Sequence, residues 1–319
     1  MGSNMRIYFC SDLHASDRCW LKFLGTPKFY GADVIIVGGD ITGKFIVPII
    51  PGPGETWTAR YMGEERRMES RDDVARLSAM ISNAGSYPVE MSADDYAAYD
   101  GQQERIDDLF RVQVLERVRR WIQLADERLA NVNVRCFVQG ANDDILEVDD
   151  ELRTSRRIEV PEGRVVEFGG FQMLSVGYGN PTPWNCPRDI SEEELAERIE
   201  RLTPEITDMR RTIFNLHVPP LGSRLDLAPR IDGDFNVVTT SSGEPDMVPV
   251  GSTAVRDAIV RHQPLLGLHG HIHESKGIKK LGDTTIANPG SEYQEGLLDG
   301  VLIDLDSNGK LVNIQLVTG

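Results

Sequence analysis

Five short apolar segments of this chain end directly in a residue that can bind a metal ion. They cover residues 5–10, 34–37, 134–138, 212–216 and 265–268. Each is rich in Val, Ile, Leu or Phe and is bounded by Gly or Asp, which is typical of strands buried on both faces. Because ligands of open α/β sheets bind beyond the carboxyl ends of the strands, the pattern predicts an α/β fold with a functional site at that edge.

Histidine is concentrated at these strand ends. Of the six histidines, only His262 lies elsewhere. Taken singly, each short motif is more often a turn or a structural residue than a metal site. A pair of imidazoles two residues apart is a stronger signal, since an extended chain can place both on one side. The candidate metal ligands are Asp12, His14, Asp40, Asn142, His217, His271 and His273.

The composition disfavours several classes of protein. The chain has 319 residues, 40% hydrophobic and 26% charged, as in an ordinary globular protein. Its formal net charge of -16 argues against non-specific nucleic-acid binding and against adhesion to anionic membranes. No apolar run approaches the ~20 residues of a membrane helix. The four cysteines form no CxxC pair, which predicts a reducing, cytoplasmic location.

The order of the motifs resembles that of the calcineurin-like metallophosphoesterase superfamily. That pattern is Asp-x-His, Gly-Asp, Gly-Asn-His-Asp/Glu, a lone His and Gly-His-x-His, and the matching segments here are 12–14, 39–40, 141–144, 217 and 270–273. Asn-Pro-Gly-Ser near the C-terminus, at 288–291, is similar to a bacterial and archaeal branch. The resemblance implies a four-layer α/β/β/α sandwich of two facing mixed sheets flanked by helices.

The third motif departs from the family pattern. We align residues 141–144 onto it, so that Asp143 stands where the family has His. An alternative frame puts Gly140 on the Gly and Ala141 on the metal-binding Asn, which would lose a ligand, so we prefer the first. The family's His lies near the leaving oxygen. Asp143 could donate a proton there only if it were protonated, and His269 is a second candidate for that catalytic role, with a core imidazole as its alternative.

Seven ligands are too many for one ion and suit two. Mixed His, Asp and Asn ligands fit Mn, Fe, Zn or Ni, of which we expect Mn to support activity in vitro best. The resemblance implies that Asp40 bridges the two ions. It also implies that Asp12, His14 and His273 complete the shell of the first ion. The remaining ligands would complete the second: Asn142, His217 and His271.

Two divalent ions would neutralise a phosphate ester and supply a bridging hydroxide for in-line attack on phosphorus. We therefore expect hydrolysis of a small phosphoester, a phosphodiester or a nucleotide-like ester. The replacement of His by Asp143 predicts weak activity on poor leaving groups. It also leaves an alternative function open, a metal-containing binding or scaffold protein that has lost turnover.

The rest of the chain predicts a single domain, 5–319, with an insertion at about 44–103. A hairpin over 45–61 and a helix over 64–83 would form a lid or the surface of a homo-oligomer. Residues 1–4 are interpreted as a remnant of cloning. Further elements are expected as helices over 104–131, 191–209 and 253–262 and as a C-terminal hairpin over 300–317.

Overall fold

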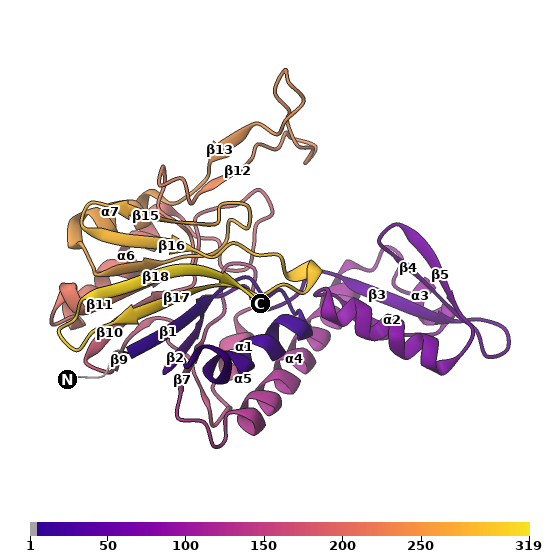
Figure 1. Ribbon diagram of the computed structural model, residues 1–319. Coiled ribbons are helices and arrows are strands. Elements are labelled where there is room, and N and C mark those ends of the chain that lie inside the picture. Colours follow the sequence, from indigo (N-terminus) through magenta and orange to yellow (C-terminus); the bar gives the residue numbers. More distant parts are fainter. Residues whose placement is uncertain (1–4) are drawn as a thin grey trace.

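The computed structural model describes residues 5–319, so the predicted cloning remnant lies outside the described residues. Two six-stranded mixed sheets face each other (Figure 1). The first sheet contains, in spatial order, β18 (Leu311–Thr318), β17 (Asp299–Leu305), β1 (Met5–Cys10), β2 (Val34–Val37), β7 (Arg135–Val138) and β8 (Ile158–Glu159). The second contains β15 (Gly277–Leu281), β16 (Thr284–Asn288), β14 (Leu266–Leu268), β11 (Thr212–Leu216), β10 (Phe171–Val176) and β9 (Arg164–Phe168).

Strand β1 illustrates why the sheets stack. Ile7 and Phe9 belong to the apolar cluster between the two sheets, whereas Tyr8 and Cys10 belong to the cluster under the outer helices. Successive side chains of a strand point to opposite faces, so a strand covered on both sides reads as a continuous apolar run. Strands β1, β2 and β7 run parallel, as do β10, β11, β14 and β16, which brings their carboxyl ends to common edges.

Helices cover both outer faces and confirm the predicted four-layer sandwich. The first sheet packs on α1 (Asp17–Tyr30), α4 (Gln103–Arg128) and α5 (Glu147–Leu152), and the second on α6 (Glu192–Leu202) and α7 (Thr253–His262). The predicted helix over 191–209 is too long, because Pro204 has no backbone N–H to continue it and 3-10 turns follow. These turns are η1 (Thr203–Glu205) and η2 (Met209–Arg211), and a third, η3 (Tyr293–Glu295), precedes β17.

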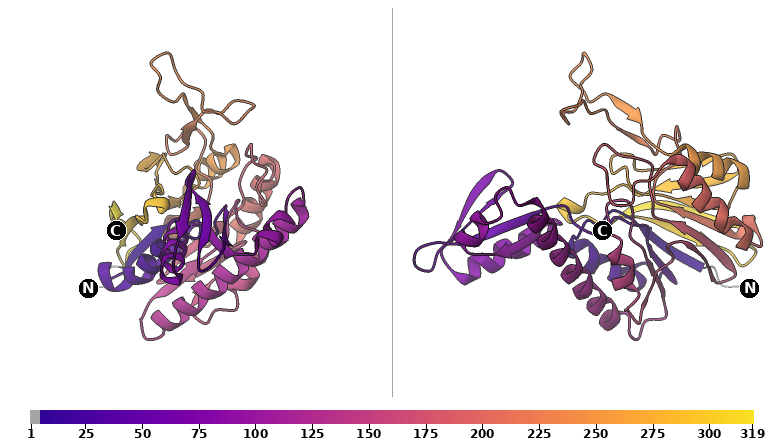
Figure 2. Two further views of the ribbon diagram at one scale, coloured as in Figure 1. Left: turned by 90° about the vertical axis from the view of Figure 1, so that its right-hand side faces the viewer. Right: turned by 180° about the vertical axis from the view of Figure 1, so that it is seen from behind.

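The predicted insertion contains a lobe that projects from the two sheets (Figures 1 and 2). Its four-stranded sheet has the order β5-β4-β3-β6 and packs on one helix. The elements are β3 (Ile46–Pro51), β4 (Trp57–Tyr61), β5 (Glu64–Met68), α2 (Arg71–Asn83), β6 (Tyr87–Glu90) and α3 (Ala93–Ala97).

The predicted helix over 64–83 is wrong in its first part. Residues 64–68 form a strand paired antiparallel with β4. Met62 and Gly63 turn the chain between them with φ values of 51° and 79°. The helix begins only after Ser70, whose hydroxyl accepts a hydrogen bond from the Asp73 amide.

A thin arm made of β12 (Leu227–Pro229), β13 (Met247–Pro249) and their connection extends beyond the second sheet (Figure 1). The C-terminal strands β17 and β18 pair antiparallel, which confirms the hairpin predicted at 300–317. Over residues 5–319, no helix is both long and apolar enough to cross a membrane.

Candidate metal centre

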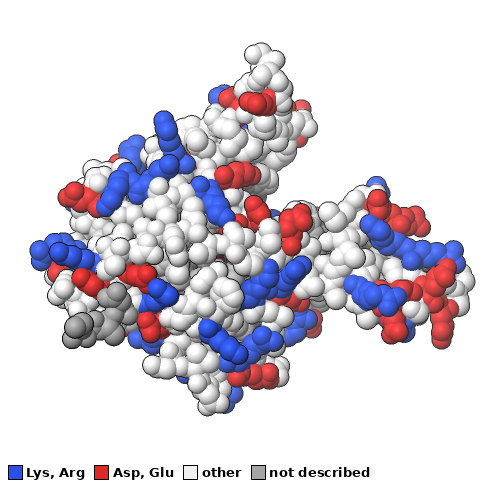
Figure 3. All heavy atoms as spheres, viewed as in Figure 1, with Lys and Arg blue, Asp and Glu red and all other residues white. Residues whose placement is uncertain are grey.

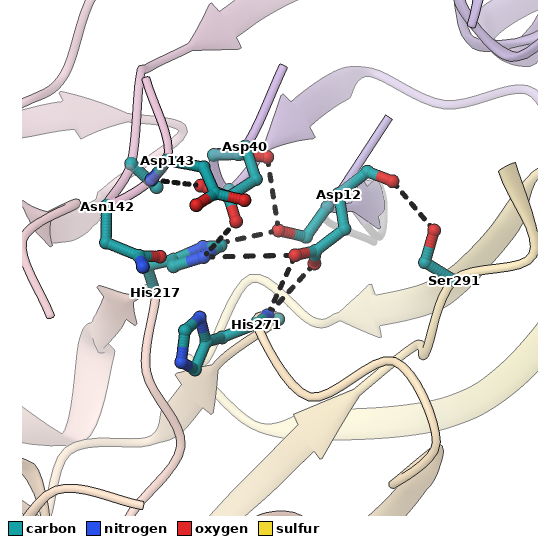
Figure 4. A network of polar contacts seen from close by, with 12 residues as sticks. Asp12, Asp40, Asn142, Asp143, His217, His271 and Ser291 are labelled. Atoms are coloured by element: carbon teal, nitrogen blue, oxygen red, sulfur yellow. Dashed lines mark hydrogen bonds and ion pairs between the residues drawn. The ribbon is translucent and has the colours of Figure 1, made fainter. Parts of the chain in front are cut away.

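Loops from five strand ends, three in the first sheet and two in the second, converge on one cluster of polar side chains (Figure 4). The loops after β1, β2 and β7 carry the candidate ligands from residues 12–14, 40 and 142. The loops after β11 and β14 carry those from residues 217 and 271–273. The structure brings together all seven predicted ligands: Asp12, His14, Asp40, Asn142, His217, His271 and His273.

Three overlapping groups of three side chains could each hold a metal ion. In each group, one ligand atom per residue lies within 4.8 Å of the others. The first group comprises Asp12, His14 and His273, the second comprises Asp40, His217 and His271, and the third comprises His14, Asp40 and Asp143. The Nε2 atoms of His14 and His273 are 3.1 Å apart. The first two groups correspond to the two predicted shells, while the assignment of ions to them stays a prediction.

The backbone of the cluster is held in a rare conformation. Asp12, His14, Asp40 and His271 have φ values of 58°, 39°, 49° and 65°. Such a conformation costs on the order of 1–3 kcal/mol per residue and persists only where the surroundings enforce it. Hydrogen bonds between the two loops provide this enforcement. The Asp12 amide donates to the Gly39 carbonyl at 2.9 Å, and the His14 amide donates to the Asp40 carbonyl at 3.0 Å.

Further contacts orient the candidate ligands. His14 Nδ1 lies 3.2 Å from the Thr42 carbonyl, which fixes the proton on Nδ1, so Nε2 is the acceptor that faces His273 Nε2. The His271 amide donates to both carboxylate oxygens of Asp12 at 3.0 Å. The Ser291 hydroxyl, from the Asn-Pro-Gly-Ser sequence, donates to the Asp12 carbonyl at 2.7 Å. These bonds tie the first group to the second sheet.

Burial and charge set different protonation states within the cluster. Burial lowers the pKa of His14 to about 4, so this ring is neutral at pH 7. Burial also lowers the pKa of His217, but the charge of Asp40, whose Oδ2 lies 3.2 Å from Nε2, outweighs burial and raises the pKa to about 9. In the metal-free protein, His217 therefore carries a proton at pH 7.

Metal binding is expected to displace that proton. The affinity of the metal-free protein for manganese should rise at least about tenfold per pH unit as the pH rises from 7 toward 9, with one or more protons released per protein, because Asp12 outweighs burial and also raises the pKa of His273. Titration calorimetry in buffers of different ionisation enthalpy measures this release. A manganese affinity that is constant from pH 7 to 9 would contradict this account.

The ion pair between His217 and Asp40 should stabilise the metal-free protein fully below pH 6.5. This contribution to stability should be lost as the pH rises through about 9.

Asn142 supplies the test of whether the cluster fits a metal. Its Oδ1 is buried and accepts no hydrogen bond from any of residues 5–319, whereas its Nδ2 donates to Asp189 at 3.3 Å. Figure 4 shows the amide directed toward the ring of His217. A buried acceptor without a donor suits a cation. This fits the alignment that places Asn142 in the motif, because Ala141 offers no ligand atom.

Asp143 lies beside the cluster, where one of its carboxylate oxygens is within 4.8 Å of ligand atoms of His14 and Asp40. Its Oδ2 lies 2.5 Å from Lys44 Nζ, and its Oδ1 accepts a hydrogen bond from the Cys186 thiol at 2.8 Å. Asp143 is thus an acceptor for two donors, and proton donation to a leaving group does not fit this position. The sequence analysis missed Lys44 and Cys186, since neither belongs to a motif.

His269 is not part of the cluster. Its ring is fully buried, its Nδ1 lies 2.7 Å from the Leu216 carbonyl, and a Cβ placed on Gly267 would lie 2.8 Å from its Nε2. The ring therefore packs over Gly267 of β14, on the face of the second sheet that is covered by helices. The predicted catalytic role does not fit this position, and the alternative of a core imidazole does.

Comparison with known proteins supports the fold. No family model matches the chain. The uncharacterized protein MJ1162 of Methanocaldococcus jannaschii is 27% identical over 167 residues, which cover 51% of this chain and 68% of that protein. The crystal structure of TT1561 of Thermus thermophilus superposes with a TM-score of 0.53 at 14% identity over 99% of both chains. Another solved structure gives 0.56 at the same identity and coverage. The chain therefore shares the overall fold of these two proteins.

Proposed function

We propose that the protein is a metal-dependent phosphoesterase that uses two divalent ions to hydrolyse a phosphodiester or a nucleotide-like ester. The observation that carries this proposal is the pair of His and Asp groups at four strand ends, which are buried except for the half-buried His271 and His273. Histidine and carboxylate donors suit Mn, Fe, Zn or Ni. When bound, such ions would neutralise the negative charge on the phosphoryl oxygens in the transition state and lower the pKa of a bound water.

The chain's own residues would hold and orient the reacting groups. Asp40 is positioned between the groups, because its carboxylate lies near both His217 and the ligand atoms of His14 and Asp143. This supports its proposed role as the bridging ligand. The four free cysteines are compatible with the proposed reducing, cytoplasmic setting.

A panel of aryl phosphate monoesters and diesters, assayed with the full chain and added manganese, tests the proposal. We expect turnover of activated diesters, with slower turnover as the leaving group becomes more basic. If the metal-loaded protein cleaves no activated ester in the panel, the phosphoesterase proposal is wrong.

Asp143 favours one second candidate, a metal-containing scaffold without turnover, because it replaces the family's His. For the enzyme, Asp143→Ala is expected to lower existing activity roughly tenfold or more, the worth of one charged hydrogen bond. Steady-state kinetics at equal metal content measures this change. A silent natural protein that gains activity in Asp143→His would instead support the scaffold.

The proposed partners follow from charge and exposure. The net charge of -16 disfavours binding to nucleic acid and to anionic membranes, and basic side chains on the face in Figure 3 are interspersed with acidic ones.

A groove of about 910 Å³ lies between the lobe and the sandwich. The groove is lined by exposed Phe45, Met62 and Met80. These exposed apolar side chains support the proposal that two copies of the chain form a homo-oligomer through the insertion.

A further inference from the structure

The open side of the metal centre is formed by a few side chains. Asp12, Asp40 and His217 have side chains no more than 3% exposed, so no substrate approaches over them. The exposed fraction rises to 17% for Asp143, 28% for His273 and 44% for Lys44. A phosphoester would therefore meet Lys44, Asp143 and His273 where it enters the cluster.

The backbone holds Lys44 firmly at this entrance. The preceding residue, Gly43, donates its amide hydrogen bond to the Tyr87 hydroxyl at 2.8 Å. A Cβ on Gly43 would lie 2.2 Å from the Gly85 carbonyl oxygen, so only glycine fits there. One residue earlier, the Thr42 amide donates to the buried Asp144 carboxylate at 2.8 Å. Lys44 thus extends from a fixed loop that also carries Asp40.

Asp143 directs the ammonium group toward the cluster. Its Oδ2 lies 2.5 Å from Lys44 Nζ, while Cys186 holds the other oxygen. One of its carboxylate oxygens lies within 4.8 Å of ligand atoms of His14 and Asp40. The ammonium therefore lies beside the predicted metal positions.

The Lys44 ammonium has hydrogen-bonding capacity to spare. It carries three N–H donors, and within residues 5–319 its one ion-pair partner is Asp143. Burial lowers the pKa of Lys44, but the charge and hydrogen bond of Asp143 outweigh burial and raise it above the ordinary value. Lysine binds phosphate as a compact positive charge.

We propose that Lys44 is a catalytic residue whose ammonium, positioned by Asp143, binds the phosphoryl oxygens of the substrate at the entrance of the metal centre. This inference rests on the proposed function. It gives the site a permanent positive charge in the region where the family's His is missing. Asp143 acts as the positioning residue, and Cys186 orients its carboxylate.

Binding of inorganic phosphate to the manganese-loaded full chain tests the proposal without requiring turnover. Lys44→Met removes the charge and keeps much of the side-chain length, and it should weaken phosphate binding about tenfold or more. Lys44→Arg keeps the charge and should stay within about threefold of the natural protein. Lys28→Met, at an exposed position on α1, is the matched control and should bind phosphate normally. Titration calorimetry gives the affinities, and elemental analysis verifies equal manganese content.

Three results would overturn the assignment. These are unchanged phosphate affinity in Lys44→Met, loss of bound manganese in that variant, and absence of phosphate binding to the loaded natural protein. The proposed function fails separately. If Lys44→Met binds phosphate weakly but the natural protein cleaves no ester, the anion site stands and the esterase proposal falls.

Discussion

Replacing Asp40 with asparagine is expected to lower ester hydrolysis by at least about 1,000-fold, corresponding to several kcal/mol of transition-state stabilisation. The substitution removes the charge that faces both predicted metal groups. The fold should survive, because asparagine tolerates the left-handed backbone conformation found at this position, where φ is 49°. The variant's kcat/KM for an activated diester, at saturating manganese, measures the effect.

The control for this substitution is Asp257→Asn on the exposed side of α7. It makes the same chemical change away from the cluster and should leave kcat/KM within about twofold, since surface substitutions have small effects. Circular dichroism should give native spectra for both variants. Activity of Asp40→Asn within about tenfold of the natural protein would mean that Asp40 does not bridge two ions.

Arg188→Met is expected to destabilise the protein by about 3–5 kcal/mol, because it leaves a buried carboxylate without its partner. The Arg188 side chain is fully buried and donates to Asp149 at 2.6 Å. It also donates to the carbonyls of Asp144 and Ile145 at 2.9 and 3.0 Å. Those residues continue the loop that carries Asn142. Denaturant unfolding of the metal-free chain measures the loss.

A double variant separates the uncompensated charge from the lost packing. Arg188→Met with Asp149→Leu removes both charges, and it should recover a large part of the stability lost in Arg188→Met. Exposed Arg153→Met, which breaks the surface pair with Asp150, should cost no more than about 1 kcal/mol. Equal stability of Arg188→Met and Arg153→Met would contradict the structural role of the buried pair.

The sandwich could be predicted because its central strands are covered on both faces. Continuous apolar runs such as β2 and β11 are the direct consequence of that covering. Strand β5 could not be predicted, because Glu64, Glu65, Arg66 and Arg67 are all exposed in a small lobe and carry no apolar alternation. Pairing with β4 decides its conformation, and a single sequence does not reveal that pairing.

The candidate ligands could be predicted because each follows a strand within a short motif. Lys44 and Cys186 could not, since they are single residues far apart in the sequence. Only the fold places them on either side of Asp143. His269 shows the opposite case, because it adjoins a motif while its ring lies in the core. The direction of a side chain at a strand end depends on backbone geometry that motif spacing does not encode.

Metal content of the purified full chain, measured by elemental mass spectrometry and paired with hydrolysis of bis(p-nitrophenyl) phosphate under added manganese, tests the central claim most directly. The account predicts about two equivalents of divalent transition metal per chain together with turnover. Two equivalents without turnover would support the scaffold instead. At most one equivalent after loading would contradict the two-ion site.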